Sequence, residues 1–168
     1  MRDLDQIVQQ RTAELQAANQ KLQQEIAERR QMEEALRVSQ ERFAKAFQAS
    51  PIPMAIQTLK EERFIDVNEA FLRRMGYQAR QVIGRTPVEL DLWGEPAARE
   101  QFLSALHREH SVRGWECQFR TSGRQLHQVL LSAELFDLDA EPNVLVIAED
   151  ISERLNLERQ LRQAQKME

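Results

Sequence analysis

The positions of glycine and proline divide this chain into three parts. All five glycines and all five prolines fall between Pro51 and Pro142, so both ends lack the residues that break helices. A segment without either residue can form one uninterrupted helix, whereas a segment that holds all of them must turn repeatedly. The sequence therefore predicts a helix, then a globular part, then a second helix.

The N-terminal segment carries a narrow row of apolar residues at seven-residue spacing, interrupted by Arg29. The members of this row are Val8, Leu15, Leu22, Leu36 and Phe43. A heptad row on an otherwise polar helix is typical of a coiled coil. Such a helix would be roughly 65 Å long, more than one globular core can cover, so we expect a parallel homodimer with these residues at its interface. A solvated single helix held by ion pairs between neighbouring turns is the alternative.

The central part has the pattern of an α+β domain. Alternation and β-branched residues predict strands at Met54–Gln57, Arg63–Val67, Val112–Arg120, Leu126–Leu135 and Val144–Glu149. Helices are predicted from Asn68 to Met75 and from Pro96 to Glu109. Asn68 has the character of a helix N-cap, and Thr121-Ser122-Gly123 that of a hairpin turn.

Composition restricts the classes of function. A net charge of −4 and a pI near 5.5 give no cationic field for a phosphate backbone, so we expect no binding to nucleic acid. The apolar runs are far shorter than a membrane span, which takes about 20 residues. A single cysteine, Cys117, between apolar neighbours indicates a reduced structural thiol and a cytoplasmic location. Membrane anchoring of the parent protein stays open.

Two stretches resemble PAS domains, which are sensory modules. The first is FIDVNEAFLRRMGYQARQVIGRTPVEL, Phe64 to Leu90, and the second is the ending VLVIAEDISER, Val144 to Arg154. The resemblance implies a five-stranded antiparallel sheet in the order 2-1-5-4-3, with helices on one face that enclose a pocket. It divides the chain into a coiled-coil signalling helix at 1–42, a PAS domain at 43–150 and a linker helix at 151–168.

The flanking helices resemble segments of bacterial sensor histidine kinases. QRTAELQAANQKLQQEIAERRQMEEALRVSQERF resembles linkers that carry signals into PAS domains, and ERQLRQAQKME resembles the approach to the phosphoacceptor helix. The resemblance implies a sensory and relay module of a two-component system that signals to a kinase domain outside this sequence. A linker of a diguanylate cyclase or of a chemoreceptor is the alternative parent.

The chain itself is not expected to be an enzyme. His107, His110 and His127 are followed by Arg, Ser and Gln, where the kinase family has an acidic residue after its phosphoacceptor histidine. Phosphoryl transfer also needs a nucleotide cradle, and the sequence has no glycine-rich motif of that kind. We therefore expect a regulatory segment without catalytic residues.

We expect either no cofactor or one that the sequence does not identify. Blue-light PAS domains carry Gly-Arg-Asn-Cys, whereas this chain has Gly84-Arg85-Thr86-Pro87, so flavin–cysteine photochemistry is excluded. Some PAS domains bind haem through a histidine on the helix that matches Pro96–Glu109, which makes His107 and His110 weak haem candidates. We expect no metal site, because two histidines lack support from cysteine or carboxylate ligands.

Two further sets of residues are candidates for the site. The pocket would be lined by large apolar side chains, unless these fill it completely: Met54, Phe71, Met75, Phe102, Leu106, Trp115, Phe119 and Leu131. The relay set is Asp150, Ile151 and Arg124. In the family the aspartate that matches Asp150 joins the last strand to the output helix through a salt bridge, and Arg124 is the predicted partner. Simple capping of the following helix by Asp150 is the alternative.

Overall fold

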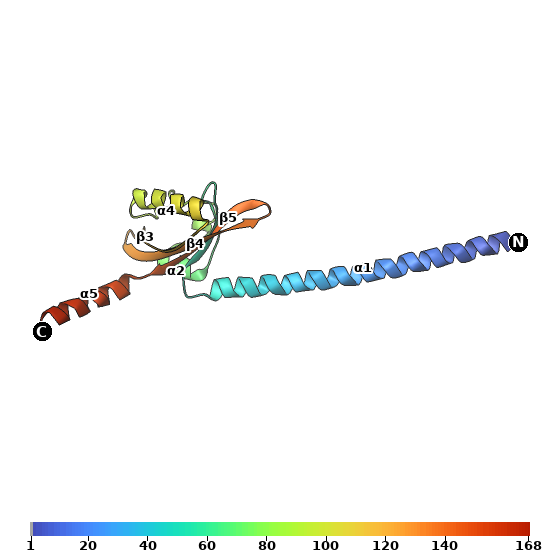
Figure 1. Cartoon of the computed structure of the whole chain (residues 1–168), viewed down its shortest axis with the longest axis horizontal. Helices are drawn as coiled ribbons and strands as arrows, with labels where there is room; N and C mark the ends of the chain where they lie inside the picture. Colours follow the sequence, from blue (N-terminus) through green and yellow to red (C-terminus); the bar gives the residue numbers. More distant parts are fainter. Residues whose placement is uncertain (1) are drawn as a thin grey trace. The chain divides into compact units, whose positions relative to one another are not determined.

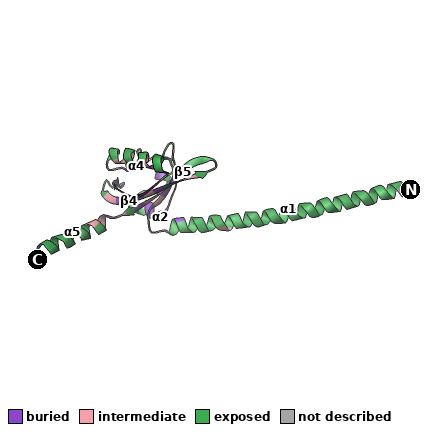
Figure 2. Cartoon of the chain, in the orientation of Figure 1, coloured by how far each residue is buried: buried purple, intermediate pink, exposed green. Residues whose placement is uncertain are grey.

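The computed structural model describes residues 2–168 and divides into two compact units, one ending at Lys45 and the other beginning at Ala46. The predicted boundary at residues 42 and 43 lies three residues earlier. Helix α1, Arg2–Ala49, has 48 residues and, as Figure 2 shows, is exposed along nearly its whole length. In the single chain the five residues of the apolar row are 55–70% exposed. Among the described residues no helix is long and apolar enough to cross a membrane.

Five antiparallel strands form the sheet of the globular unit, in the order β2-β1-β5-β4-β3. This is the order that the resemblance implied. The strands are β1 Met54–Thr58, β2 Phe64–Val67, β3 Ser111–Arg120, β4 Leu126–Leu138 and β5 Glu141–Asp150. All five predicted strands are therefore confirmed, and the largest difference is at the β4–β5 hairpin, where both strands run three residues further than predicted.

Helices cover the sheet and close the core. They are α2 Glu69–Met75, α3 Ala79–Val82 and α4 Pro96–Glu109, and α5 Ser152–Lys166 follows the last strand. Helix α4 packs against β3 and β4 (Figure 1) and buries Phe102 and Leu106 completely. The short helix α3 was not predicted, because four residues are too few to show a helical period.

The burial pattern of strand β3 changes along its length because the strand contains a bulge. Trp115, Cys117 and Phe119 face the core, but Val112 is buried too. A bulge between Val112 and Trp115 shifts the register by one residue, and Gly114 there has φ 65°. An extra residue in one strand moves the preceding side chains to the opposite face, so both apolar sets reach the core.

Asn68 fixes the start of α2 against the segment that enters the sheet. Its side chain is fully buried, and its Oδ1 accepts hydrogen bonds from the backbone N–H groups of Phe71, at 3.0 Å, and Met54, at 2.9 Å. Its Nδ2 donates to the carbonyl oxygens of Phe47, at 3.0 Å, and Ile52, at 2.9 Å. The predicted N-cap is confirmed, and the amide also joins three separate backbone segments.

Candidate functional site

The interior of the globular unit encloses a small cavity beneath α2 and α4. Side chains from all five strands contribute to its wall, together with Pro87 and Trp93 from the connection between α3 and α4. Its volume is about 30 Å³, which accommodates a molecule of roughly the size of water. Sites for drug-sized or cofactor-sized ligands occupy about 300–1,000 Å³. In this conformation the core is packed.

Four of the predicted pocket residues line this cavity: Phe71, Phe102, Phe119 and Leu131. The other four predicted residues do not line it. Met75 and Leu106 are fully buried elsewhere in the core, Trp115 packs against the core from the bulged part of β3, and Met54 is half-buried on β1. The sequence indicated which side chains are apolar but not which of them leave space between them.

The histidines considered for haem lie away from the cavity. His107 is exposed near the end of α4, and its Nδ1 lies 2.8 Å from the carbonyl oxygen of Leu103 in the preceding turn. His110 is exposed at the C-cap of the same helix, with φ 64°. Neither ring lines the interior space, because the inner face of α4 is formed by Phe102 and Leu106. Over residues 2–168 no cluster of three or more potential ligands is placed to hold a metal ion.

Cys117 lies on the inner face of β3 and is 7% exposed. Burial raises the pKa of its thiol to about 12. The thiolate, which is the reactive form, is therefore scarce at neutral pH. This agrees with the predicted structural role of the residue.

A buried carboxylate stands where β5 ends and α5 begins. The side chain of Asp150 is 8% exposed, and its Oδ2 lies 2.8 Å from Nδ1 of His127 on β4 and 3.5 Å from a guanidinium nitrogen of Arg74 on α2. Its Oδ1 accepts a hydrogen bond of 2.9 Å from the backbone N–H of Ser152, the first residue of α5. One carboxylate thus contacts α2, β4 and α5.

The first turn of α5 is also tied to β4 by the chain that surrounds Asp150. The backbone N–H of Gln128 donates to Oγ of Ser152 at 2.9 Å, and the N–H of Ile151 donates to the carbonyl of Gln128 at 2.9 Å. Ile151 is 1% exposed. The start of α5 is therefore held by three hydrogen bonds and one buried apolar side chain.

The environment of Asp150 favours its charged form. Burial acts to raise the pKa of the carboxyl, but the hydrogen bonds from Ser152 and the interaction with His127 outweigh burial and lower the pKa below its ordinary value. A charged group inside the fold is stable only where it is paired and hydrogen-bonded. Loss of either partner would therefore be felt directly at the base of α5.

The predicted ion pair between Arg124 and Asp150 is wrong. Arg124 lies at the tip of the β3–β4 hairpin, where its guanidinium is 3.2 Å from Oδ2 of Asp91. Asp150 pairs with Val129 in the β4–β5 register, and His127, two residues along β4, shares the same face of the strand. His127 therefore takes the place predicted for Arg124.

The same hairpin docks on the end of α2. The N–H of Ser122 donates to the carbonyl of Met75 at 2.8 Å, and its Oγ donates to the carbonyl of Gly76 at 2.6 Å. Gly76 is the C-cap of α2, with φ 76°, and a Cβ added there would lie 2.5 Å from Oγ of Ser122. The backbone conformation thus requires glycine, and an added Cβ would also displace the hydroxyl of Ser122.

Gly76→Ala should lower the free energy of unfolding by about 2–4 kcal/mol, because a non-glycine residue at positive φ costs about 1–2 kcal/mol and the contact with Ser122 adds to it. Urea unfolding followed by tryptophan fluorescence measures the loss. Gly84→Ala is the matched control, since Gly84 has φ 81° but nothing within 4 Å of an added Cβ. Equal losses in the two variants would show that the approach of Ser122 carries no cost.

Comparisons with known proteins agree with this fold. Residues 41–109 match the sequence model of a PAS domain family. The PAS domain of an HTR-like protein from Haloarcula marismortui is 21% identical, with a TM-score of 0.61 over 73% of this chain and 99% of that one. A PAS domain from a two-component sensor histidine kinase is 14% identical, with a TM-score of 0.57 over 67% of this chain and 98% of that one.

A third solved structure is an RNA-binding Light-Oxygen-Voltage receptor. It is 19% identical, with a TM-score of 0.61 over 74% of this chain but 36% of its own. At these identities the likeness establishes the fold. A search of curated proteins found no match.

Proposed function

Because this chain contains a PAS domain, we propose that it is the sensory and relay module of a bacterial, cytoplasmic sensor histidine kinase, acting as a parallel homodimer. The observation that carries the proposal is the Asp150 junction, which joins α2 and β4 to the first residue of α5. A change in the domain that moves α2 or β4 must alter the contacts that hold α5. Helix α5 would carry that change to a kinase domain outside this sequence.

The relay needs two conformations of similar free energy. A signal shifts such an equilibrium only by its differential affinity for the two states. The Asp150 cluster could adopt two such conformations. Its carboxylate is shared among partners from three segments, so one contact can strengthen as another weakens. The exposed Leu157 and Leu161 of α5 would pair with their counterparts in the second copy.

The small cavity favours one form of this proposal. An interior space of about 30 Å³ suits a domain that transmits a signal received elsewhere better than one that holds haem or flavin in its core. The apolar row of α1 is the natural input, since a coiled coil can pass a change of register along its length. The chain would then couple an input helix to an output helix.

The test is ATP-dependent autophosphorylation of the full-length protein, with Asp150→Asn compared with wild type. We expect the rate to change at least about threefold in the variant while the dimer persists, because the junction controls the output helix. Asp137→Asn, an exposed acid on β4, is the control and should leave the rate unchanged. Cyclic dinucleotide synthesis in place of phosphohistidine would support the cyclase parent, and an unchanged rate in Asp150→Asn would overturn the relay.

Asp150 should also make stability depend on pH in a defined direction. Its folded-state pKa is lowered, so its contribution is present above the ordinary aspartate value, about 3.9, and is lost as the pH falls through the folded-state pKa. The difference in unfolding free energy between wild type and Asp150→Asn, about 1–3 kcal/mol at pH 7, should therefore shrink between pH 5 and pH 3. Urea unfolding at a series of pH values measures it, and a difference that grows on acidification would contradict the assignment.

A further inference from the structure

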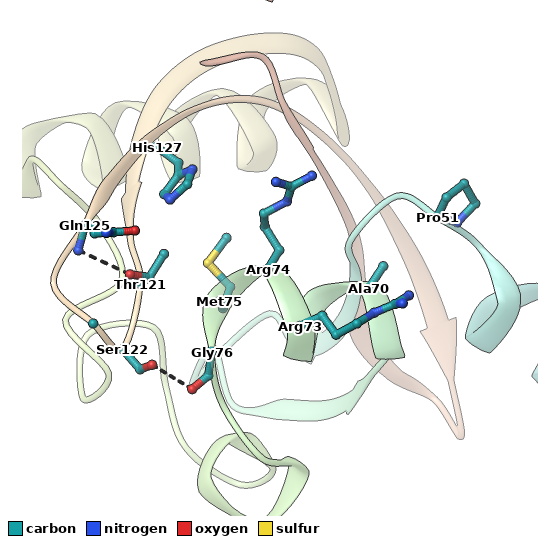
Figure 3. Close-up of a pocket in the computed structure, with 11 residues that line it drawn as sticks. Pro51, Ala70, Arg73, Arg74, Met75, Gly76, Thr121, Ser122, Gln125 and His127 are labelled. Atoms are coloured by element: carbon teal, nitrogen blue, oxygen red, sulfur yellow. Dashed lines mark hydrogen bonds between the residues drawn. The ribbon is translucent and has the colours of Figure 1, made fainter. Parts of the chain in front are cut away.

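A polar groove on the surface of the globular unit lies beside the Asp150 junction. It runs between the end of α2 and the β3–β4 hairpin, and its volume is about 610 Å³. Its charged and titratable lining residues are Arg73, Arg74 and His127. Thr121 and Gln125 add polar side chains from the hairpin, as Figure 3 shows. The groove is thus lined by basic and neutral groups.

The two arginines keep hydrogen-bonding capacity that the fold does not use. Arg73 is exposed, and Arg74 is 52% exposed and approaches Asp150 at 3.5 Å through one nitrogen. A guanidinium carries five N–H donors, so this contact leaves most of Arg74 available to a ligand. Figure 3 shows that Arg74 extends toward the side of the groove where His127 lies, whereas Arg73, also in the lining, extends in the opposite direction, away from His127.

The carboxylate that borders the groove does not cancel this charge. The Asp150 side chain is 8% exposed, and its two oxygens are already bonded to His127 and to the backbone of Ser152. The groove therefore carries two permanent cations and borders one buried and largely satisfied anion. The macrodipole of α2 places its negative end here, which explains why arginines are favoured at these positions but not why their heads face a groove of ligand size.

We propose that this groove binds a small molecule with two or more oxyanion groups, either carboxylates or phosphates. Guanidinium groups match the planar geometry of oxyanions and bind them through paired hydrogen bonds. The divergence of Arg73 and Arg74 calls for more than one anionic group on the ligand. Pro51, which is exposed and also in the lining, provides an apolar contact for its body.

Binding would act on the junction through Arg74. This residue faces both the groove and Asp150, so a bound oxyanion competes with the carboxylate for the same guanidinium. Asp150 then loses one of its three partners, and the contacts that hold the first turn of α5 are redistributed. This regulatory step rests on the proposed relay, whereas the binding itself does not.

The test is calorimetric titration of the full 168-residue chain with citrate and, separately, with pyrophosphate, at an ionic strength held constant with sodium chloride. We expect saturable binding of one ligand per chain, and the stronger of the two anions identifies the carboxylate or phosphate class. Arg73→Gln should weaken binding about tenfold or more, since a hydrogen bond to a charged group is lost. Arg80→Gln, on the exposed surface of α3 outside the groove, should leave affinity unchanged.

Amide NMR spectra of the same chain locate the effect. Saturable shifts at Gly76, Ser122 and Gln125 support the site, and accompanying shifts at Ser152 support the coupling to α5. Heat or shifts that grow without saturation, or equal weakening in Arg73→Gln and Arg80→Gln, would overturn the site. Binding without any change at Ser152 would overturn the coupling, and failure of the relay itself would appear separately, as an unchanged phosphorylation rate in Asp150→Asn.

Discussion

The double substitution Leu15→Lys and Leu22→Lys should convert the proposed dimer into a monomer. Both leucines lie in the apolar row of α1 and are 70% and 55% exposed in the single chain. Four leucines per dimer would lose their burial, worth about 1.5–3 kcal/mol each, and four ammonium groups would meet at the seam. The dissociation constant should therefore rise by at least about four orders of magnitude. Size-exclusion chromatography with light scattering measures the change.

The control places the same charges on the other side of the helix. The control substitutions are Ala13→Lys and Gln20→Lys, which are seven residues apart like the test pair. Each lies five residues after a member of the apolar row, which places it on the outer side of the coiled coil. This variant should remain dimeric at the wild-type concentration. A wild-type monomer, or a dimer that survives in the leucine variant, would show that the row is not the interface.

Asn68→Ala should cost about 3–5 kcal/mol of unfolding free energy, the largest loss that we expect from a single polar side chain here. Its amide makes four hydrogen bonds to backbone groups. Removing it leaves those groups without partners in a buried place, at about 1–3 kcal/mol for each group that water cannot reach. Urea unfolding followed through Trp93 and Trp115 reports on the globular unit.

Asn143→Ala provides the comparison. Asn143 is 3% exposed, and its side chain donates a hydrogen bond to the carbonyl of Glu141, at 3.0 Å. We expect it to cost about 1 kcal/mol. If the two alanine variants lost the same free energy, the cost would reflect burial of an amide in general, and the role of Asn68 as a connector would be wrong.

The missed partner of Asp150 can be traced to one turn. Leu138 pairs with Glu141 across a two-residue loop, and the same uninterrupted register leads to Val129 opposite Asp150. Recognition of that loop would have placed His127 beside the carboxylate. Such loops normally carry Asn-Gly or Asp-Gly, whereas this one has Asp139 and Ala140, both at positive φ. The usual sequence signal for the turn was therefore absent.

The cavity illustrates a different limit. The alternation along β3 accounts for the burial of both Cys117 and Phe119, because side chains on a strand alternate between its faces. Whether the core is hollow depends on how side chains from several segments interlock. Protein interiors are packed to nearly crystalline density, so differences of a few Å³ at each contact decide whether a cavity remains. The order of apolar and polar residues in the sequence does not indicate these small volumes.

The sequence by itself determined the parts of this protein that depend on local preference. The distribution of glycine and proline gave the order of helix, globule and helix, the two-residue period gave the strands, and Asn68 marked the start of α2, because each depends on near neighbours in the chain. Only the tertiary structure decided which groups meet. Arg74, His127 and Asp150 are 76 residues apart at their extremes, and they form one cluster because the strand order and the β4–β5 register bring them together.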